Sequence, residues 1–439
     1  MDSVMKWVLN CIYALLLSVM SPVILWRSLR HGRYRQGWSE KLFGRLPLSG
    51  DGKPVVWFHA VSVGEVIQLH KIVDAFRTDT GDSCRIVVTT STDTGYELAR
   101  SRFQDCTVSW FPLDFSWAVS NALRRVNPQM VVLVELELWP NFLSECGRAG
   151  VSTALVNARI SERSFQGYSR VRSVMAPLFR QFDVVTAQTD AYASRLLSLG
   201  VSRTAMQVTG SVKYDGVTTN QKNATTAGFQ KLFGIADDDV VLMAGSTQHP
   251  EEQLALDAWM ALRSEYPNLR LILVPRHKER FDEVASAVRS TGCRLQRRSE
   301  CDEGRAVSDD SVVLLDTIGE LSACWGLADI AFVGGSFGSR GGQNMLEPAA
   351  YGAAVLFGPN TWNFKGIVEQ LKFADAALQL RTQDEFLPMV KKLLSDPDSR
   401  NRLGKNAGCL VAAQQGAVKK TTALLRSAIS GDGVTQEAA

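Results

Sequence analysis

The chain has 439 residues, of which 45% are hydrophobic and 21% are charged, and its formal net charge is +3. This composition is typical of a globular protein and excludes a largely disordered one. One hydrophobic core seldom serves so long a chain, so we expect two domains plus an appendage. The small net charge shows none of the strong positive excess that marks many nucleic-acid-binding proteins, and no nucleic-acid partner is predicted.

The cysteines and histidines show no metal-binding pattern. Five histidines are dispersed, and none of the eight cysteines forms a CxxC pair, so the spacing of a zinc site is missing. We therefore expect reduced thiols in the core of a cytosolic body and no metal ion. The cysteines are Cys11, Cys84, Cys106, Cys146, Cys293, Cys301, Cys324 and Cys409.

The N-terminus carries an uncharged apolar stretch, Trp7–Trp26, with a tryptophan at each end. As a helix, about 20 such residues would extend roughly 30 Å, the thickness of a bilayer core. A basic cluster follows the stretch, whereas a cleaved signal peptide has its positive charge first. We predict a membrane anchor with the body in the cytoplasm. Pro22 and Asn10 leave open a helix lying in the membrane interface, and a buried core helix is the remaining alternative. The cluster comprises Arg27, Arg30, Arg33, Arg35, Lys41 and Arg45.

Short apolar, β-branched runs alternate with amphipathic stretches such as Ala118–Val126 and Ala191–Leu199. This alternation predicts parallel sheets covered by helices. The first series of strands begins at Pro54, Cys84, Thr107, Met130, Ser152 and Asp183, and the second at Asp239, Leu269, Val312, Asp329 and Ala353. The predicted fold is therefore α/β, with two Rossmann-like domains and an N-terminal membrane-anchor helix.

A stretch rich in Gly, Thr, Asn and Lys separates the two series and is predicted to be a linker. The closing helical stretch ends in a polar tail, which we expect to fray. The predicted organisation is a membrane anchor and basic collar at 1–30, an N-terminal Rossmann-like acceptor domain at 31–212, a linker at 213–228, a C-terminal Rossmann-like nucleotide-sugar domain at 229–405, a helix at 406–429 and a flexible tail at 430–439.

Two predicted strands in the first half of the chain are each followed by acidic residues at their carboxyl ends. VVLVELELWPN (Val131–Asn141) places Glu135 and Glu137 before Trp-Pro, and PVVWFHAVSVGE, which begins at Pro54, runs through a turn to Glu65. Ligands of open α/β sheets bind at strand carboxyl ends, and an unpaired buried carboxylate is costly. The pattern therefore indicates an active site.

Each of these acids also has a structural interpretation. Glu65 is equally suited to capping the helix that follows it. Glu135 and Glu137 share one face if their strand stays regular, and their repulsion then raises one pKa. A buried pair with Arg159 or Arg163 is the alternative. His59 is expected to be a structural hydrogen-bonding residue, and Ser62 lacks the GxSxG setting of a nucleophile.

The second half carries features typical of phosphate and sugar binding at its strand ends. AGSTQHPEE (Ala244–Glu252) leads through Ser246 and Thr247 into a helix whose N-terminus suits an anion, with an ordinary N-cap as the alternative. VPRH ends a strand with Arg276 and His277, and a salt bridge is the alternative role for this arginine. The glycine-rich Gly334–Gly352 contains Asn344 and Glu347 but is no Walker A loop, and GxGxxG is also missing.

These motifs together resemble the 3-deoxy-D-manno-octulosonic acid (Kdo) transferases of glycosyltransferase family 30. The resemblance runs from about Trp26 to Gly416 and rests on these segments: GWSEKLFGR, HAVSVGE, TTSTDTG, ELELWPN, NARISERS, GSVKYD, LILVPRHKERF, DTIGELSACWGLADIAFVGGSF, GGQNMLEPAAYG and GPNTWNF. It implies a GT-B fold and an inverting transferase that needs no metal or cofactor. It also implies CMP-β-Kdo as donor and a lipid A precursor as acceptor, at the cytoplasmic face of the inner membrane.

The resemblance also implies roles for particular residues. The family's general base corresponds to Glu65, and its second carboxylate to Glu137, with Glu135 as the reserve. The residues implied in donor binding are Lys213, Ser246, Thr247, Arg276, His277, Gly335, Ser336, Asn344 and Glu347. The chain departs from the family pattern at Gln343, Pro348 and Gln248-His249. Two other functions compete: a membrane-associated GT-B transferase for another nucleotide sugar, and a catalytically silent lipid- or nucleotide-binding protein.

Overall fold

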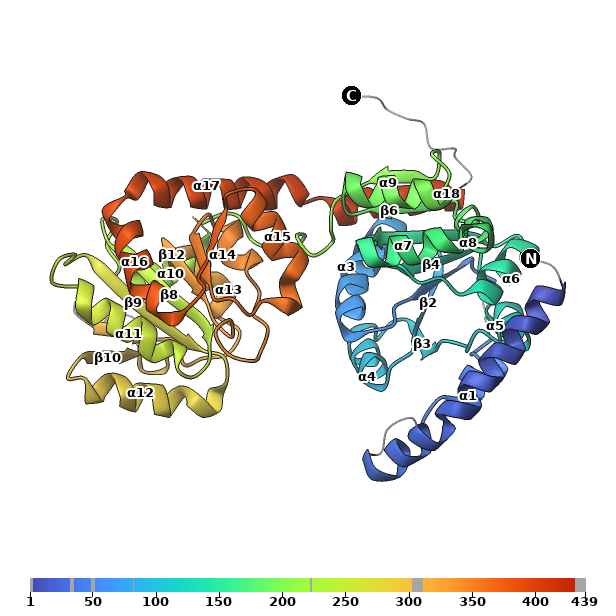
Figure 1. Cartoon of the computed structure of the whole chain (residues 1–439), viewed down its shortest axis with the longest axis horizontal. Helices are drawn as coiled ribbons and strands as arrows, with labels where there is room; N and C mark the ends of the chain where they lie inside the picture. Colours follow the sequence, from blue (N-terminus) through green and yellow to red (C-terminus); the bar gives the residue numbers. More distant parts are fainter. Residues whose placement is uncertain are drawn as a thin grey trace. The chain divides into compact units, whose positions relative to one another are not determined.

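The computed structural model describes residues 3–31, 35–48, 52–81, 83–221, 223–301 and 311–430 (Figure 1). The chain divides into two compact units, the first formed by Met1–Asp215 with Gln414–Ala439 and the second by Gly216–Ala413. Each unit is built on its own seven-stranded sheet, and every strand pairs in parallel with its neighbours. The predicted α/β class with two Rossmann-like domains is confirmed.

The sheet of the first unit has the order β3-β2-β1-β4-β5-β6-β7. Its strands are β1 (Val55–His59), β2 (Arg85–Thr90), β3 (Thr107–Trp110), β4 (Met130–Val134), β5 (Ser152–Ala158), β6 (Val184–Ala187) and β7 (Met206–Val208). Its helices are α1 (Ser3–His31), α2 (Trp38–Phe43), α3 (Val63–Thr80), α4 (Asp93–Arg102), α5 (Ser116–Val126), α6 (Pro140–Ala149), α7 (Glu162–Arg170), α8 (Arg172–Phe179), α9 (Asp190–Leu199) and α18 (Ala417–Ser430).

Both faces of the first sheet are buried. Along β1, Val55 and Trp57 belong to one core cluster, whereas Val56 and Phe58 belong to the other. This two-sided burial explains why the strand is a continuous apolar run in the sequence. The returning helix α18 packs on α3 and supplies Leu425 to the second of these clusters.

The sheet of the second unit has the order β10-β11-β9-β8-β12-β13-β14. Its strands are β8 (Val240–Thr247), β9 (Leu269–Pro275), β10 (Arg294–Arg297), β11 (Ser311–Leu314), β12 (Ile330–Val333), β13 (Ala354–Phe357) and β14 (Ala377–Gln379). Its helices are α10 (Ala224–Leu232), α11 (Glu251–Leu262), α12 (Phe281–Ser290), α13 (Leu321–Cys324), α14 (Leu346–Ala350), α15 (Lys365–Phe373), α16 (Phe386–Ser395) and α17 (Pro397–Gln414).

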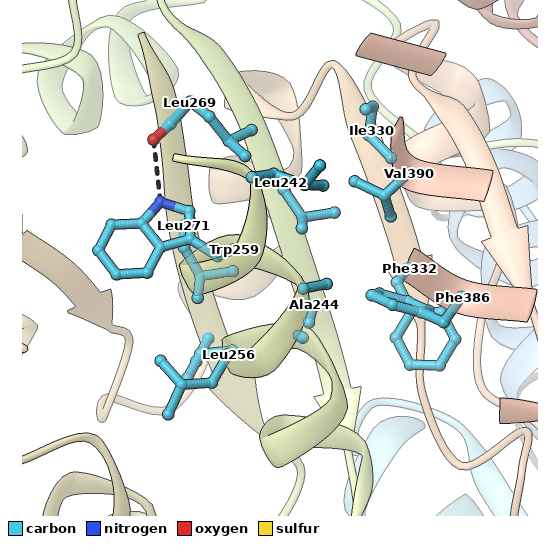
Figure 2. Close-up of a cluster of buried hydrophobic side chains, with 14 of the residues drawn as sticks. Leu242, Ala244, Leu256, Trp259, Leu269, Leu271, Ile330, Phe332, Phe386 and Val390 are labelled. Carbon is cyan, nitrogen blue, oxygen red and sulfur yellow. Dashed lines mark hydrogen bonds between the residues drawn. The ribbon is translucent and has the colours of Figure 1, made fainter. Parts of the chain in front are cut away.

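Trp259 of α11 is a central side chain of the second core (Figure 2). It is 1% exposed, and its indole N–H donates to the carbonyl oxygen of Leu269 at 2.9 Å. In the same cluster, Phe386 of α16 meets Phe332 of β12 edge to face, with ring centroids 5.0 Å apart. Aromatic side chains on two helices thus fix both helices to the sheet.

The strands predicted from apolar runs are all present, but three others escaped prediction. These are β7, β10 and β14, each of three or four residues at or beside a sheet edge. Their polar or exposed positions give no apolar run to detect. The closing helical stretch forms two helices, α17 and α18, because Gly416 between them adopts a φ of 90°. The predicted tail lies outside the described residues from 431 onward.

Helix α1 is long and apolar enough to cross a membrane, by length and composition alone. The eight cysteines are free, as predicted, but Cys11 and Cys409 are exposed and so are not core thiols. Cys11 lies on α1, where exposed side chains prevail. The cysteines in the core are Cys146 and Cys324.

Replacing Trp259 with alanine is expected to lower the free energy of unfolding by about 3–5 kcal/mol, because a large buried side chain leaves a cavity. Phe373→Ala is the matched control, since that ring is 96% exposed, and we expect a change within about 0.5 kcal/mol. Urea unfolding followed by circular dichroism measures both. Equal losses in the two variants would contradict the assignment of Trp259 to the core.

Candidate active site

The predicted acids meet where the strand order of the first sheet changes direction. Strands β1 and β4 are neighbours, although two strands separate them in the sequence. Glu65 lies just after β1, in the first turn of α3, and Glu135 follows β4 directly. A change of strand order leaves a crevice at the carboxyl ends, where α/β proteins bind ligands. The sheet topology therefore brings together acids that are 70 residues apart in the chain.

The carboxylate of Glu65 is held by two donors. Its Oε1 accepts from the hydroxyl of Ser62 at 2.7 Å, and its Oε2 accepts from the backbone N–H of Val61 at 2.9 Å. Ser62 is in turn the N-cap of α3. The helix-capping interpretation of Glu65 therefore describes its contacts correctly. Burial raises the pKa of Glu65, while the two hydrogen bonds act against that rise.

Glu135 forms an ion pair with Arg159, one of the two partners that the sequence left open, but the pair is only partly buried because the arginine side chain is 52% exposed. Its Oε2 lies 2.7 Å from Nε of Arg159, and its Oε1 accepts from Nε2 of Gln68 at 3.4 Å. The residue has a φ of 61°, which ends the strand and turns the chain away from the regular alternation of side chains. Glu135 is thus committed to structural contacts.

Glu137 lies two residues further along, beyond the end of the strand. Burial raises its pKa to about 7, and the negative charges of Glu65 and Glu135 add to the rise. The expected repulsion between clustered acids is therefore present, and it acts on Glu137. A carboxyl group of this pKa exchanges its proton near neutral pH, which suits acid–base chemistry. This favours Glu137 over Glu135 as the second functional carboxylate.

A network of buried amide side chains supports the acids. Oε1 of Gln68 accepts from Nδ2 of Asn157 at 2.6 Å, and Oδ1 of Asn157 accepts from the backbone N–H of Val212 at 3.1 Å. Both amide residues are buried, and the network joins α3 to the ends of β4 and β5. Sequence reasoning missed Gln68 and Asn157. The sequence held one indication of this network: each residue is a polar side chain among the buried apolar residues of its helix or strand.

Lys213 follows this network and lies in the first unit, near the acids. Burial lowers its pKa, the negative charge of Glu135 raises it, and Arg159 lowers it further. Two cations and three carboxylates thus influence one another at the carboxyl edge of this sheet. The site can accept a proton and can also bind an anionic group.

His59 is structural, as predicted. It is fully buried and stacks on Phe111 with ring centroids 3.7 Å apart. Its Nδ1 lies 3.0 Å from the carbonyl oxygen of Thr89, and burial lowers its pKa to about 3. The imidazole is therefore neutral at physiological pH and orders the strand ends.

The second sheet has an equivalent change of strand order between β8 and β12. Ser246 and Thr247 close β8, and the glycine-rich segment follows β12. Ser246 has a φ of 54°, whereas Thr247 is buried. A Cβ on Gly334 would meet Cα of Thr247 at 2.5 Å, so only glycine lets the two backbones approach so closely.

Glu251, at the start of α11, fills the amide nest of this glycine-rich loop. Its carboxylate accepts from the backbone N–H groups of Gly335, Ser336 and Phe337 at 2.7–3.0 Å. The hydroxyl of Ser336 donates to Val333 O at 2.8 Å, and that side chain is fully buried. The two predicted donor-binding residues in this loop, Gly335 and Ser336, therefore use their amides internally, and a ligand would meet the outer surface of the loop.

The other predicted donor-binding residues lie around the same edge of the second sheet. Arg276 and His277 follow β9, and both are exposed. Asn344 donates to Oε1 of Glu347 at 2.9 Å and accepts from the backbone N–H of Leu346. Burial raises the pKa of Glu347. The structure thus gathers eight of the nine predicted donor residues at the strand ends of the second unit, and Lys213 lies in the first.

A large hollow of the first unit lies elsewhere. It is lined by Lys53, Arg85 and Thr107, which begin or precede β1, β2 and β3, and so it opens at the amino ends of the strands. Size alone therefore does not mark the candidate site. Within the described ranges, no group of three or more His, Cys, Asp or Glu side chains is arranged to hold a metal ion.

Comparison with known proteins agrees with this geometry. A family model described as 3-Deoxy-D-manno-octulosonic-acid transferase (kdotransferase) matches residues 36–216. A 3-deoxy-D-manno-octulosonic acid transferase of Haemophilus influenzae is 32% identical over 421 residues, which cover 94% of this chain and 97% of the relative. The chain belongs to this family of transferases. A relative of the same name from Bordetella pertussis is 33% identical over 430 residues, with 93% and 97% covered.

A solved structure extends the likeness to the whole fold. It is the crystal structure of a UDP-N-acetylglucosamine 2-epimerase from Listeria monocytogenes, described as putative. The alignment covers 87% of the chain described here and 98% of the epimerase chain. The TM-score is 0.52 and the identity 14%, so this likeness concerns the fold alone. It agrees with the two Rossmann-like domains of the family member described here.

We expect Gln68→Leu to lower the free energy of unfolding by about 1–3 kcal/mol, because Asn157 and Glu135 lose a buried partner. Gln166→Leu is the control: the side chain of Gln166 is exposed and its amide donates to Glu162 within α7, so the change should stay within about 0.5 kcal/mol. Urea unfolding compares the two. The role of the network would be refuted if Gln68→Leu were as stable as the control.

Proposed function

We propose that this chain transfers Kdo from CMP-Kdo to a hydroxyl group of a lipid A precursor, in lipopolysaccharide biosynthesis. The observation that carries the proposal is the pairing of Glu65 with Glu137 at the change of strand order in the first sheet. Membership of the transferase family supplies the reaction class. The arrangement of acids then indicates how that reaction is catalysed.

Glu65 is the proposed general base. Its carboxylate is oriented by Ser62 and Val61, and hydrogen bonds to an ionised carboxylate keep it ready to accept a proton. A base must reach the hydroxyl whose proton it removes, and the first turn of a helix at a strand end provides a fixed position. Glu65 takes the proton of the acceptor hydroxyl as the oxygen attacks the anomeric carbon.

The attack is proposed to occur on the face of the sugar opposite CMP, so that the configuration inverts. The new bond joins the acceptor oxygen to the anomeric carbon while the bond to the phosphate oxygen of CMP breaks. The leaving CMP carries the negative charge of its phosphate, and cations stabilise such a group. Arg276, which is exposed after β9, is the proposed cation, and Lys213 is also assigned to donor binding. No metal ion or cofactor is part of this proposal.

The donor side is assigned to the carboxyl edge of the second sheet. Ser246, His277, Asn344 and Glu347 gather there and supply hydroxyl, imidazole, amide and carboxylate groups for a nucleotide. Thr247 is fully buried and its hydroxyl donates to the carbonyl oxygen of Val274, so we assign it a role in shaping the end of β8. The backbone nest of the glycine-rich loop is already occupied by the carboxylate of Glu251. We therefore assign Gly335 and Ser336 the task of shaping the loop beneath the ligand.

The proposed place of action is the cytoplasmic face of the inner membrane. The acceptor is an anionic lipid, and α1 provides an apolar element beside basic residues such as Arg27 and Arg30. Basic residues near a membrane surface attract anionic headgroups.

The reaction is tested by incubating the full chain with CMP-Kdo, generated in situ, and tetra-acylated lipid A precursor. A gain in lipid mass by one or more Kdo units, read by mass spectrometry, is the expected result. Parallel assays with UDP- and GDP-sugars test the competing donors. Turnover of one of those sugars in place of CMP-Kdo would contradict the proposal.

Glu65→Gln should lower the transfer rate by about 10²–10⁴-fold, because the amide cannot take the proton. Binding of CMP, measured by calorimetry, should stay unchanged. Glu97→Gln is the control, since Glu97 is an exposed acid on α4 of the same unit, and its rate should match that of the parent chain. A parent-like rate in Glu65→Gln would show that another group is the base.

Glu65→Gln should lower the pKa of Glu137. Burial raises that pKa to about 7, and the negative charge of Glu65 adds to the rise, so removing this charge removes part of it. The carboxyl group of Glu137, followed by NMR from pH 4 to 9 in the parent chain and in the variant, gives both midpoints. A midpoint that is unchanged or higher in Glu65→Gln would contradict the coupling.

A further inference from the structure

Helix α1 turns one continuous stripe of its surface toward the first unit. Its shielded positions fall on one side of the helix, because they recur three, four or seven residues apart. All other described side chains of α1 are exposed. The shielded positions are Met5, Lys6, Leu9, Asn10, Tyr13, Leu17, Ile24 and Ser28.

The N-terminal part of this stripe is bonded to the unit by polar side chains. Asn10 is 5% exposed; its Nδ2 donates to the hydroxyl of Ser116 at 2.8 Å, and its Oδ1 accepts from the backbone N–H of the same serine at 3.0 Å. The hydroxyl of Tyr13 donates to Oδ2 of Asp114 at 3.0 Å, and Lys6 forms an ion pair with Glu145. A buried polar contact is costly to break, so these bonds fix the helix to the unit.

The C-terminal part of α1 is bonded to the segment that follows it. Arg35 donates from Nε and Nη2 to the carbonyl oxygen of Ser28, at 3.0 and 2.7 Å. Leu17, Leu25 and Trp38 line an apolar groove between α1 and the start of α2. Helix α2 in turn packs on α5, the helix that begins with the Ser116 bonded to Asn10. The N-terminal part of α1 is therefore bonded directly to the folded unit, and its C-terminal part lies beside the start of α2.

The opposite side of α1 is apolar and uncovered. Its most exposed large side chains are Trp7, Leu15, Leu16, Val19, Leu25, Trp26 and Leu29, each more than half exposed. The half-exposed Trp117 of the unit adds apolar surface near α1, because its ring stacks at 4.5 Å on the buried Phe115, which Tyr13 contacts. Guanidinium groups border the patch, with Arg30 placed over the ring of Trp26. Apolar side chains bordered by cations suit the surface of a membrane with anionic lipids.

A span across the bilayer conflicts with these contacts. Beyond Tyr13 the uncharged part of the helix is Ala14–Trp26, 13 residues that extend only about 20 Å. A span needs about 20 residues and roughly 30 Å. Including Lys6 and Asn10 would draw their partners on α5 and α6 into the hydrocarbon as well, where their polar groups are costly.

We propose that α1 lies in the interface of one leaflet, docked on the first unit, with its uncovered face in contact with anionic phospholipid. Both ends of the helix then stay on the same side of the membrane as the folded units. This inference is independent of the proposed reaction, because it rests on contacts of α1 alone and its test measures topology.

The test is protease protection of the full chain carrying an N-terminal epitope tag. In intact spheroplasts the tag should survive added proteinase K while a periplasmic marker protein is digested. In inverted inner-membrane vesicles the tag and the folded units should both be digested. Loss of the tag in spheroplasts, with the remaining chain protected, would establish a span and overturn the proposal. Recovery of the chain in the soluble fraction would overturn it too.

A double-mutant cycle tests the docking itself in detergent-solubilised protein. Tyr13→Phe and Asp114→Ala each remove the same hydrogen bond, so their effects on the melting temperature should be less than additive. Tyr13→Phe combined with Asp74→Ala is the matched control, because Asp74 lies on α3 and pairs with His70; these two effects should add. Additive effects in the first pair would show that α1 is not docked, and would refute the proposal.

Discussion

The organising constraint of the first unit is the collection of negative charge at one sheet edge. Glu65, Glu135 and Glu137 meet there because β1 and β4 are neighbours, and burial makes each charge costly. The unit compensates them unequally. Glu135 is paired with Arg159, and Glu65 receives two hydrogen bonds. Glu137 has the least compensation, and its pKa rises to about 7. The surroundings of Glu65 and Glu137 thereby raise the pKa of both side chains.

The second sheet has the same change of strand order, but hydrogen-bond donors gather at its edge where the first sheet gathers carboxylates. At its change of strand order the glycine-rich loop offers backbone N–H groups, and the buried carboxylate of Glu251 accepts from three of them and from the backbone N–H of Gln248. The loop is thereby fixed without a ligand, and the side chains around it stay available. One copy of the fold thus concentrates acids, and the other concentrates amide, hydroxyl and guanidinium groups. A transferase needs both a base for its acceptor and a binding surface for an anionic donor.

The sequence predicted what depends on local pattern. Strands such as β1 and β4 are continuous apolar runs because both faces of each sheet are buried, and Glu65 and Glu137 stand out as charges that end such runs. The edge strands β7 and β14 were missed because half-exposed residues leave no such run. Gln68 and Asn157 were missed for a different reason: their partners lie 67 and 55 residues away, and no periodicity records which distant polar groups a buried amide will meet.

The N-terminus of α6 is bonded both to the groups that hold α1 and to the segment that carries Glu137. Asp114, which accepts from Tyr13, also accepts from the backbone N–H groups of Asn141 and Phe142 at 3.0 and 2.8 Å, and so caps α6. Helix α6 begins at Pro140, three residues after Glu137. Nδ2 of Asn141 also donates to Oδ1 of Asn10. The segment that carries the titrating acid is therefore held at its far end by the same groups that hold α1. Because Asn10, Asp114 and Asn141 are buried, one set of hydrogen bonds fixes both α1 and the end of the segment that carries Glu137.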